Sequence, residues 1–208
     1  MKISLFFISF LLISFFSIAQ YSNLKFENLS TSEGLSSSTV VEIFQDSDGF
    51  LWFGTIDGLN RFDGQEFLIY RTAIDNQNSI SSNRINAIEE DGKGNLWIGT
   101  SNGLNIFNKT FEKFYRIDLS RPQGNGGVSE VINDLLFDEK LNALWIATKS
   151  GLCRLHFEDD LTYTEWDLSV FRFDENDPES LDNDDVTSIN KDSEGNIWVG
   201  TAGASLNL

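Results

Sequence analysis

Four tryptophans stand in nearly the same pentapeptide at regular intervals along the chain. The four segments are Leu51–Thr55, Leu96–Thr100, Leu144–Thr148 and Ile197–Thr201, and tryptophan takes the second place in each. The residue numbers of successive tryptophans differ by 45, 48 and 53. A period of this length indicates one supersecondary unit that is repeated in tandem. A repeat array forms a binding surface more often than a single catalytic pocket.

Each repeat contains the signals of four short strands. A β-branched run such as Val40–Phe44 precedes an Asp-x-x-Gly turn, and the tryptophan segment follows as a second strand. Thr-x-x-Gly-Leu makes the next turn, and two more apolar runs supply the third and fourth strands. Four antiparallel strands in about 45 residues form one β-propeller blade. A β-sandwich also uses many short strands, but it does not require the same Trp-x-Gly-Thr at every period.

The sequence therefore predicts an all-β propeller with about three complete blades and a partial fourth. The expected repeats cover about 35–70, 80–115, 128–173 and 181–208 within a propeller region 20–208. Residues 24–29 resemble the outer strand that completes the last blade of a closed propeller. We expect an open arc of a larger ring, and a four-bladed ring closed by residues 24–29 is the alternative.

The first residues have the pattern of an export signal. Lys2 gives a short positive start, Ile3–Phe16 is apolar apart from serines, and Ala19 ends a small-residue cleavage pattern. We expect residues 1–19 to be a signal peptide and the mature chain to lie in the periplasm. An uncleaved membrane anchor is the alternative, although the apolar run is shorter than the roughly 20 residues that a membrane span needs.

The net charge and the few reactive residues disfavour several classes of function. The net charge of −17 disfavours nucleic acid and anionic membrane surfaces as partners. His156 has no nearby Cys or His with which to share a metal, and Cys153 is the only cysteine. Asp46–Gly49 lacks the later bidentate Glu of a calcium loop and is interpreted as a turn. We expect no catalytic residue, metal site or cofactor, and no enzyme activity.

Residues that recur in every copy serve the fold, so the candidates for function lie elsewhere. Trp166 is the tryptophan outside the repeat pattern, in the enlarged outer part of the third repeat. An exposed indole there stacks on a sugar ring or marks a partner contact, whereas the structural alternative is that it fills the longer hairpin. The expected structural core consists of Trp52, Trp97, Trp145, Trp198, Gly54, Gly99, Gly200, Thr55, Thr100, Thr148 and Thr201.

At these residues the chain resembles the two-component regulator propeller repeat. Ser82–Phe107 fits the family pattern almost residue for residue, and the likeness covers nearly everything after residue 30. Two features of the third copy depart from the pattern: Ala147 replaces the glycine, and Asp138 stands seven residues before Trp145 instead of six. In the fourth copy, the turn after Thr201 is one residue longer.

The resemblance implies a sensory role. In that family, seven-bladed propellers form the periplasmic part of hybrid two-component systems, ahead of a membrane helix and a histidine kinase, and many are thought to sense oligosaccharides. The implied partners are an oligosaccharide, the rest of the same propeller, a membrane-bound kinase and a second copy of the full ectodomain. The rival interpretations are a propeller-fold lyase or glycosidase, and a scaffold for a protein partner.

Overall fold

The computed structural model describes residues 25–119, 127–157, 166–203 and 206–208, and it contains four antiparallel sheets in this part of the chain. Blade 1 consists of β1 Val40–Gln45, β2 Leu51–Thr55, β3 Gly58–Phe62 and β4 Phe67–Tyr70. Blade 2 consists of β5 Ile85–Glu90, β6 Leu96–Thr100, β7 Gly103–Asn108 and β8 Lys113–Ile117. Blade 3 consists of β9 Ile132–Asp138, β10 Ala143–Thr148, β11 Gly151–Phe157 and β12 Trp166–Phe171. Blade 4 consists of β13 Val186–Lys191, β14 Ile197–Thr201 and β15 Leu206–Asn207.

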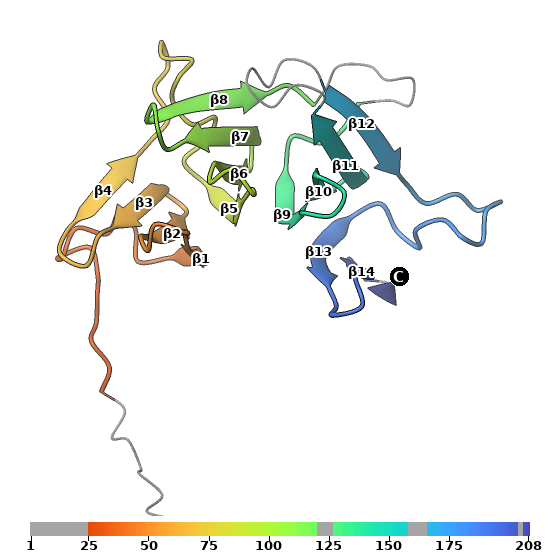
Figure 1. Ribbon diagram of the computed structural model, residues 1–208, viewed down its shortest axis with the longest axis horizontal. Helices are drawn as coiled ribbons and strands as arrows, with labels where there is room; N and C mark the ends of the chain where they lie inside the picture. The colour runs from red at the N-terminus through yellow and green to blue at the C-terminus, as the bar shows by residue number, and fades with distance from the viewer. Residues whose placement is uncertain (1–24, 120–126, 158–165, 204–205) are drawn as a thin grey trace, which may run out of the picture.

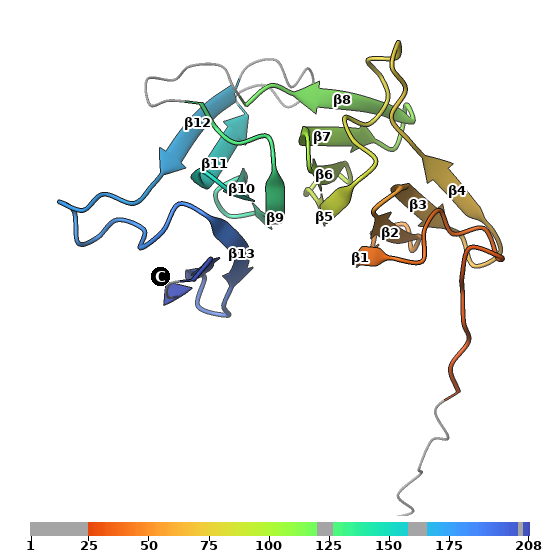
Figure 2. The same ribbon diagram turned by 180° about the vertical axis from the view of Figure 1, so that it is seen from behind.

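The blades stand side by side in an arc (Figure 1). The first strand of each blade, β1, β5, β9 or β13, lies on the concave side, and β4, β8 and β12 lie on the convex side. The view from behind shows the same order (Figure 2). Within each sheet, successive strands pair with one another, so each sheet is a meander. The predicted fold class, a β-propeller with three four-stranded blades and a partial fourth, is confirmed.

The tryptophans explain how neighbouring blades adhere. Trp52 is fully buried between blades 1 and 2, where it packs with Leu59, Ile85 and Phe107. Trp97 takes the same place between blades 2 and 3, and Trp145 between blades 3 and 4. Burying a large aromatic side chain stabilises a protein by about 1.5–3 kcal/mol. A tryptophan in each repeat therefore stabilises the contact between that blade and the next.

The repeated threonine and asparagine hold the loop that leads into each inner strand. In blade 1 the Ser36 N–H donates to Asn60 Oδ1 at 2.9 Å, and the Ser36 hydroxyl lies 2.9 Å from Thr55 Oγ1. Blade 2 repeats both contacts with Ser81, Asn105 and Thr100. Buried polar groups need such partners, so these side chains fix the loop's position.

The third copy uses different residues for the same task. Cys153 takes the position of the buried asparagine, and the Ser129 N–H donates to Ser150 Oγ at 2.6 Å instead. Ala147 replaces the glycine of the Trp-x-Gly-Thr segment. Gly54 and Gly99 face Ile85 and Ile132 of the next blade. Val186 takes the equivalent position in blade 4 and shares a buried cluster with Ala147. A smaller residue on blade 4 thus accompanies the extra methyl group on blade 3.

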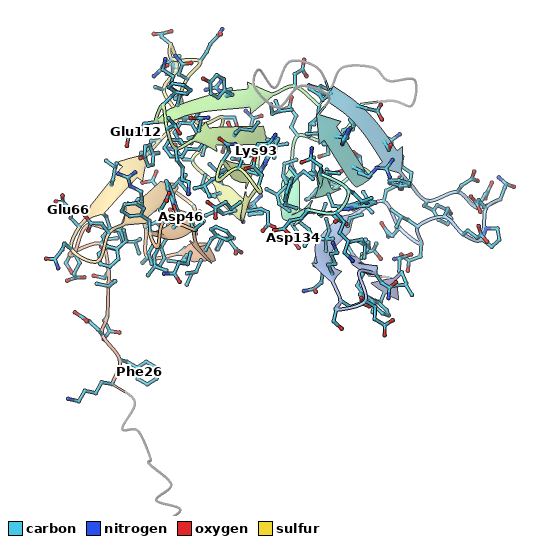
Figure 3. All side chains as sticks on the ribbon, viewed as in Figure 1. Phe26, Asp46, Glu66, Lys93, Glu112 and Asp134 are labelled. Carbon is cyan, nitrogen blue, oxygen red and sulfur yellow. The ribbon has the colours of Figure 1, made fainter. Side chains whose placement is uncertain are left out.

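Two sequence expectations concern the N-terminal region. Residues 1–19, the expected signal peptide, lie outside the described residues. Residues 25–30 form no strand, and the segment that carries the exposed Phe26 runs away from the blades (Figure 3). The role of 24–29 as an outer closing strand therefore stays a prediction.

Candidate functional site

A β-bulge interrupts the inner strand of every blade at the same place. The register with the second strand shifts between Val40 and Glu42 in blade 1, and between Ile85 and Ala87 in blade 2. The corresponding shifts in blades 3 and 4 leave one extra residue each. The four bulged residues are Val41, Asn86, Asn133 and Thr187. A bulge redirects a side chain out of the regular alternation of the strand, and bulges are common beside functional sites.

All four bulged residues line one cavity of about 530 Å³ on the concave side of the arc. This volume falls within the range of small-ligand sites, about 300–1,000 Å³. The remaining lining residues come from the segments just before the inner strands and from the turns after the repeated threonines. They are Arg84, Ser101, Val131, Lys149 and Asp185. We call these nine residues the inner rim.

Backbone hydrogen bonds between blades hold the inner rim in place. The Gly58 N–H donates to Asn83 O at 2.7 Å, and the Gly103 N–H donates to Glu130 O at 2.6 Å. The equivalent turn of blade 3 bonds in the same way, from Gly151 N–H to Asp184 O at 2.8 Å. Each turn thus clamps the segment that precedes the next inner strand, so rim positions are fixed by backbone geometry.

Side chains of the inner strands also join successive blades. Asn86 Nδ2 donates to Ile132 O at 2.7 Å, and Asn133 Nδ2 donates to Val186 O at 2.6 Å. These bonds satisfy backbone groups that an inner edge strand would otherwise leave unpaired. They also fix the orientation of both amides beside the cavity.

Carboxylates of the inner strands accept a second set of hydrogen bonds between successive blades. The Phe137 N–H donates to Glu89 Oε1 at 3.0 Å, and the Ile189 N–H donates to Asp134 Oδ2 at 2.7 Å. Figure 3 places Asp134 on the concave side of the arc. Burial raises the pKa of Glu89 to about 7 and raises the pKa of Asp134 as well. Burial, with the charge of Asp134, also raises the pKa of Glu42.

The inner rim differs in charge from the acidic chain as a whole. Arg84 and Lys149 are exposed there, with Asp185 as the one carboxylate among the lining residues. Within the described ranges, neither cation has an ion pair or a side-chain hydrogen bond. The Ser101 hydroxyl oxygen is buried and likewise has no hydrogen-bond partner among the described residues. This arrangement suits recognition of a polar ligand that carries negative charge.

A larger cavity of about 1,240 Å³ lies between blades 3 and 4 on their outer side. Its walls include Trp145, Phe171 and Ile197. At the interface of blades 1 and 2 the same region is filled by Phe107 and Phe114. The cavity thus occupies a region that packs neighbouring blades together elsewhere in the structure, and we do not assign it as a binding site.

A cluster at the Asp-x-x-Gly turns connects blades 1 and 2. Lys109 Nζ lies 2.7 Å from Asp48 Oδ2, 2.6 Å from Glu90 Oε1 and 3.5 Å from Asp46 Oδ2. Burial opposes the charge on Lys109, but these carboxylates outweigh it and raise the pKa of the ammonium group. Its contacts are satisfied within the protein, so this cluster is structural.

The structure places the candidates from the sequence as follows. Trp166 is half-buried at the start of β12 and packs against the core between blades 2 and 3, away from the residues that line the inner rim. Its role as a ligand contact stays a prediction. His156 Nδ1–H donates to Asn142 O at 3.0 Å. Burial raises the pKa of Cys153 to about 12. Trp198 is half-exposed on blade 4.

Sequence reasoning missed the inner rim, although a signal was present. The residue after each repeated threonine is Ile56, Ser101, Lys149 or Ala202, whereas the threonine itself is repeated. The type of residue at the bulge also differs between copies, although the bulge stands at the same place in every blade. Variation at a fixed offset inside a strict repeat indicates positions that the fold does not constrain.

Within the described ranges, no group of three or more His, Cys, Asp or Glu residues could hold a metal ion. Among the same residues, no helix has the length and apolar character that crossing a membrane requires.

Comparisons with known proteins agree with the repeat pattern and the fold. The family model of the two component regulator propeller matches residues 34–57, 79–102 and 180–203. A histidine kinase of Formosa agariphila is 54% identical over 48 residues, which are 23% of this chain and 4% of the kinase.

Solved structures give a similar result over more of the chain. The extracellular domain described as that of hybrid two component system BT3049 from B. thetaiotaomicron has a TM-score of 0.70 at 24% identity, over 86% of this chain and 24% of that chain. The extracellular domain of the hybrid system BT4673 of the same organism has a TM-score of 0.66 at 25% identity. This match covers 85% of the present chain and 22% of the BT4673 chain. The present chain thus spans about a quarter of these domains.

Proposed function

We propose that this chain, which belongs to the two-component regulator propeller family, is a ligand-binding part of an extracytoplasmic sensor and that its ligand is a carbohydrate. The observation that carries the proposal is the inner rim, a cavity that residues from all four blades line in a fold made of this family's repeats. Its amides and hydroxyls suit a hydroxyl-rich ligand, because both groups donate and accept hydrogen bonds.

The signalling partner in this proposal is a histidine kinase. Support comes from the kinase of Formosa agariphila, which shares one closely similar segment of 48 residues with this chain. Ligand binding would act on the kinase through the propeller, and a second copy of the full ectodomain is proposed as a further partner. A lyase or glycosidase is not favoured, because the matching family model is that of a two component regulator and the BT3049 and BT4673 structures are described as domains of hybrid two component systems.

Two experiments test the proposal. A fusion of alkaline phosphatase after residue 208 should be active in cells and should lose activity when residues 1–19 are deleted. An active β-galactosidase fusion at the same position would instead place the chain in the cytoplasm.

The second experiment concerns the ligand. Isothermal titration of the purified chain with a panel of defined oligosaccharides should give saturable binding to at least one of them. A folded chain that binds no member of the panel would remove carbohydrate sensing from the proposal.

A further inference from the structure

We propose that the inner rim selects an acidic saccharide, with Arg84 and Lys149 as the two cationic groups that hold its negatively charged substituent. The saccharide part of this inference rests on the proposed function, whereas the choice of an anion rests on the charges of the rim. Arg84 precedes β5 of blade 2, and Lys149 lies in the turn between β10 and β11 of blade 3. Both line the same cavity.

These two cations differ from three other cations of the chain, each of which has a carboxylate partner. Lys109 contacts three carboxylates, Lys191 lies 2.7 Å from Asp138 Oδ1, and Arg71 lies 3.0 Å from Asp57 Oδ2. In a chain with a net charge of −17, carboxylates are plentiful, yet no described carboxylate pairs with Arg84 or Lys149. Two unpaired cations in one cavity create a local positive potential that attracts an anion.

Both cations stand on backbone that is already fixed. The segment of Arg84 is held on both sides, because Asn83 O accepts from Gly58 N–H and Arg84 O accepts from Ser101 N–H. Lys149 follows Thr148, whose Oγ1 accepts from Ser150 N–H at 3.1 Å and donates to Gly151 O at 2.8 Å. A fixed backbone lowers the entropy that a ligand must remove when it binds.

The chemistry of the pair fits an oxyanion. A guanidinium group binds a carboxylate or a sulfate through two parallel hydrogen bonds, and an ammonium group adds a compact charge. The buried hydroxyl of Ser101 supplies a further donor at the wall of the cavity. The amides of Asn86 and Asn133 donate to backbone carbonyls, which leaves their carbonyl oxygens as acceptors for sugar hydroxyls.

The remaining lining residues limit the charge of the ligand. Asp185 contributes one negative charge, so Arg84 and Lys149 exceed it by a single charge. Val41 and Val131 provide apolar surface that suits the C–H groups of a sugar ring. The rim therefore favours a saccharide unit with one acidic group and several free hydroxyls over a densely charged polyanion.

The test is a titration of the folded full chain with three matched probes: galactotriose, trigalacturonate and 6-sulfated galactotriose. We expect an acidic probe to bind at least tenfold more tightly than the neutral one, with an affinity that falls as salt rises. A preference for trigalacturonate identifies a carboxylate as the recognised group, and a preference for the sulfated probe identifies a sulfate.

Variants separate the inner rim from general electrostatics. Arg84→Gln and Lys149→Met should each weaken binding of the acidic probe about tenfold and should weaken galactotriose binding by a clearly smaller factor. Asp185→Asn should tighten binding of the acidic probe, because it removes a repulsive charge. Lys113→Gln, at an exposed lysine of the outer strand β8, is the matched control and should change nothing. Circular dichroism verifies that each variant is folded.

The outcomes distinguish this inference from the proposed function. If galactotriose binds as tightly as the acidic probes, or if acidic binding survives both Arg84→Gln and Lys149→Met, the anion inference is wrong and carbohydrate binding stands. If none of the three probes binds but neutral sugars outside this set do, the anion inference again fails alone. If no saccharide of any class binds, both fail.

Discussion

Gly99 of blade 2 faces Ile132 of blade 3 so closely that a β-carbon on residue 99 would lie 2.6 Å from Cγ2 of Ile132. The same relationship holds one interface earlier, where a β-carbon on Gly54 would lie 2.9 Å from Ile85 Cγ2. The glycine of Trp-x-Gly-Thr is thus required by the distance between blades.

Gly99→Ala should destabilise the chain by about 1–3 kcal/mol, because the new methyl group overpacks a fixed interface. Combining it with Ile132→Val should recover part of the loss, since Ala147 and Val186 form this combination at the next interface. Urea unfolding of both single variants and of the double variant measures the coupling. Purely additive losses would show that the two side chains do not compete for space.

Glu89 predicts a specific dependence of stability on pH. Burial raises its pKa from 4.5 to about 7, so between these values the native chain holds a proton that the unfolded chain has released. Stability attributable to Glu89 is therefore present below pH 4.5 and is lost as pH rises toward 7. Glu89→Gln stays neutral, and its amide oxygen can still accept from the Phe137 N–H.

We expect Glu89→Gln to be more stable than the parent at pH 8 by about 1–3 kcal/mol. The difference should shrink toward zero at pH 4.5. Thermal unfolding of both proteins across this range makes the comparison, and the difference cancels the titration of groups common to both. A stability difference that does not vary with pH would contradict the shifted pKa.

The repeated tryptophans should differ in their coupling to the turn aspartate. Trp52 Nε1–H donates to Asp46 Oδ2 at 2.8 Å, whereas the buried Nε1–H of Trp145 has no hydrogen-bond partner in the described part of the chain. In a double-mutant cycle, Trp52→Phe and Asp46→Asn should show a coupling of about 1 kcal/mol. Trp145→Phe and Asp138→Asn are the matched control and should be additive. Equal coupling in both pairs would contradict this prediction.

Lys109 should stabilise the contact between blades 1 and 2. Lys109→Met leaves the carboxylates of Asp48 and Glu90 facing each other without a counter-charge, so we expect a loss of about 1–3 kcal/mol. Salt should reduce the loss, because it screens the repulsion that remains. Urea unfolding at low and high salt provides the measurement, with Lys113→Gln as the control. An unchanged unfolding midpoint at low salt would show that this cluster does not join the blades.

Much of the fold was predictable because each repeat is local. The turn residues, the strand runs and the buried tryptophan of one blade lie within about 45 residues, so sequence spacing alone reveals them. The combination of Ala147 with Val186 was not predictable, because the two residues join one buried cluster only when the sheets stand side by side. The charge of the inner rim was not predictable either, because Arg84 and Lys149 are 65 residues apart in sequence and come together only in the folded chain.

The sequence by itself determined the class of fold and the number of sheets, because the same strand and turn signals recur at a regular spacing. Only the tertiary structure decided where a ligand can bind. The inner rim exists because four bulges direct one residue each toward a shared cavity, and bulges depend on the register between strands. Register is a property of paired strands, so no single segment of the sequence contains it.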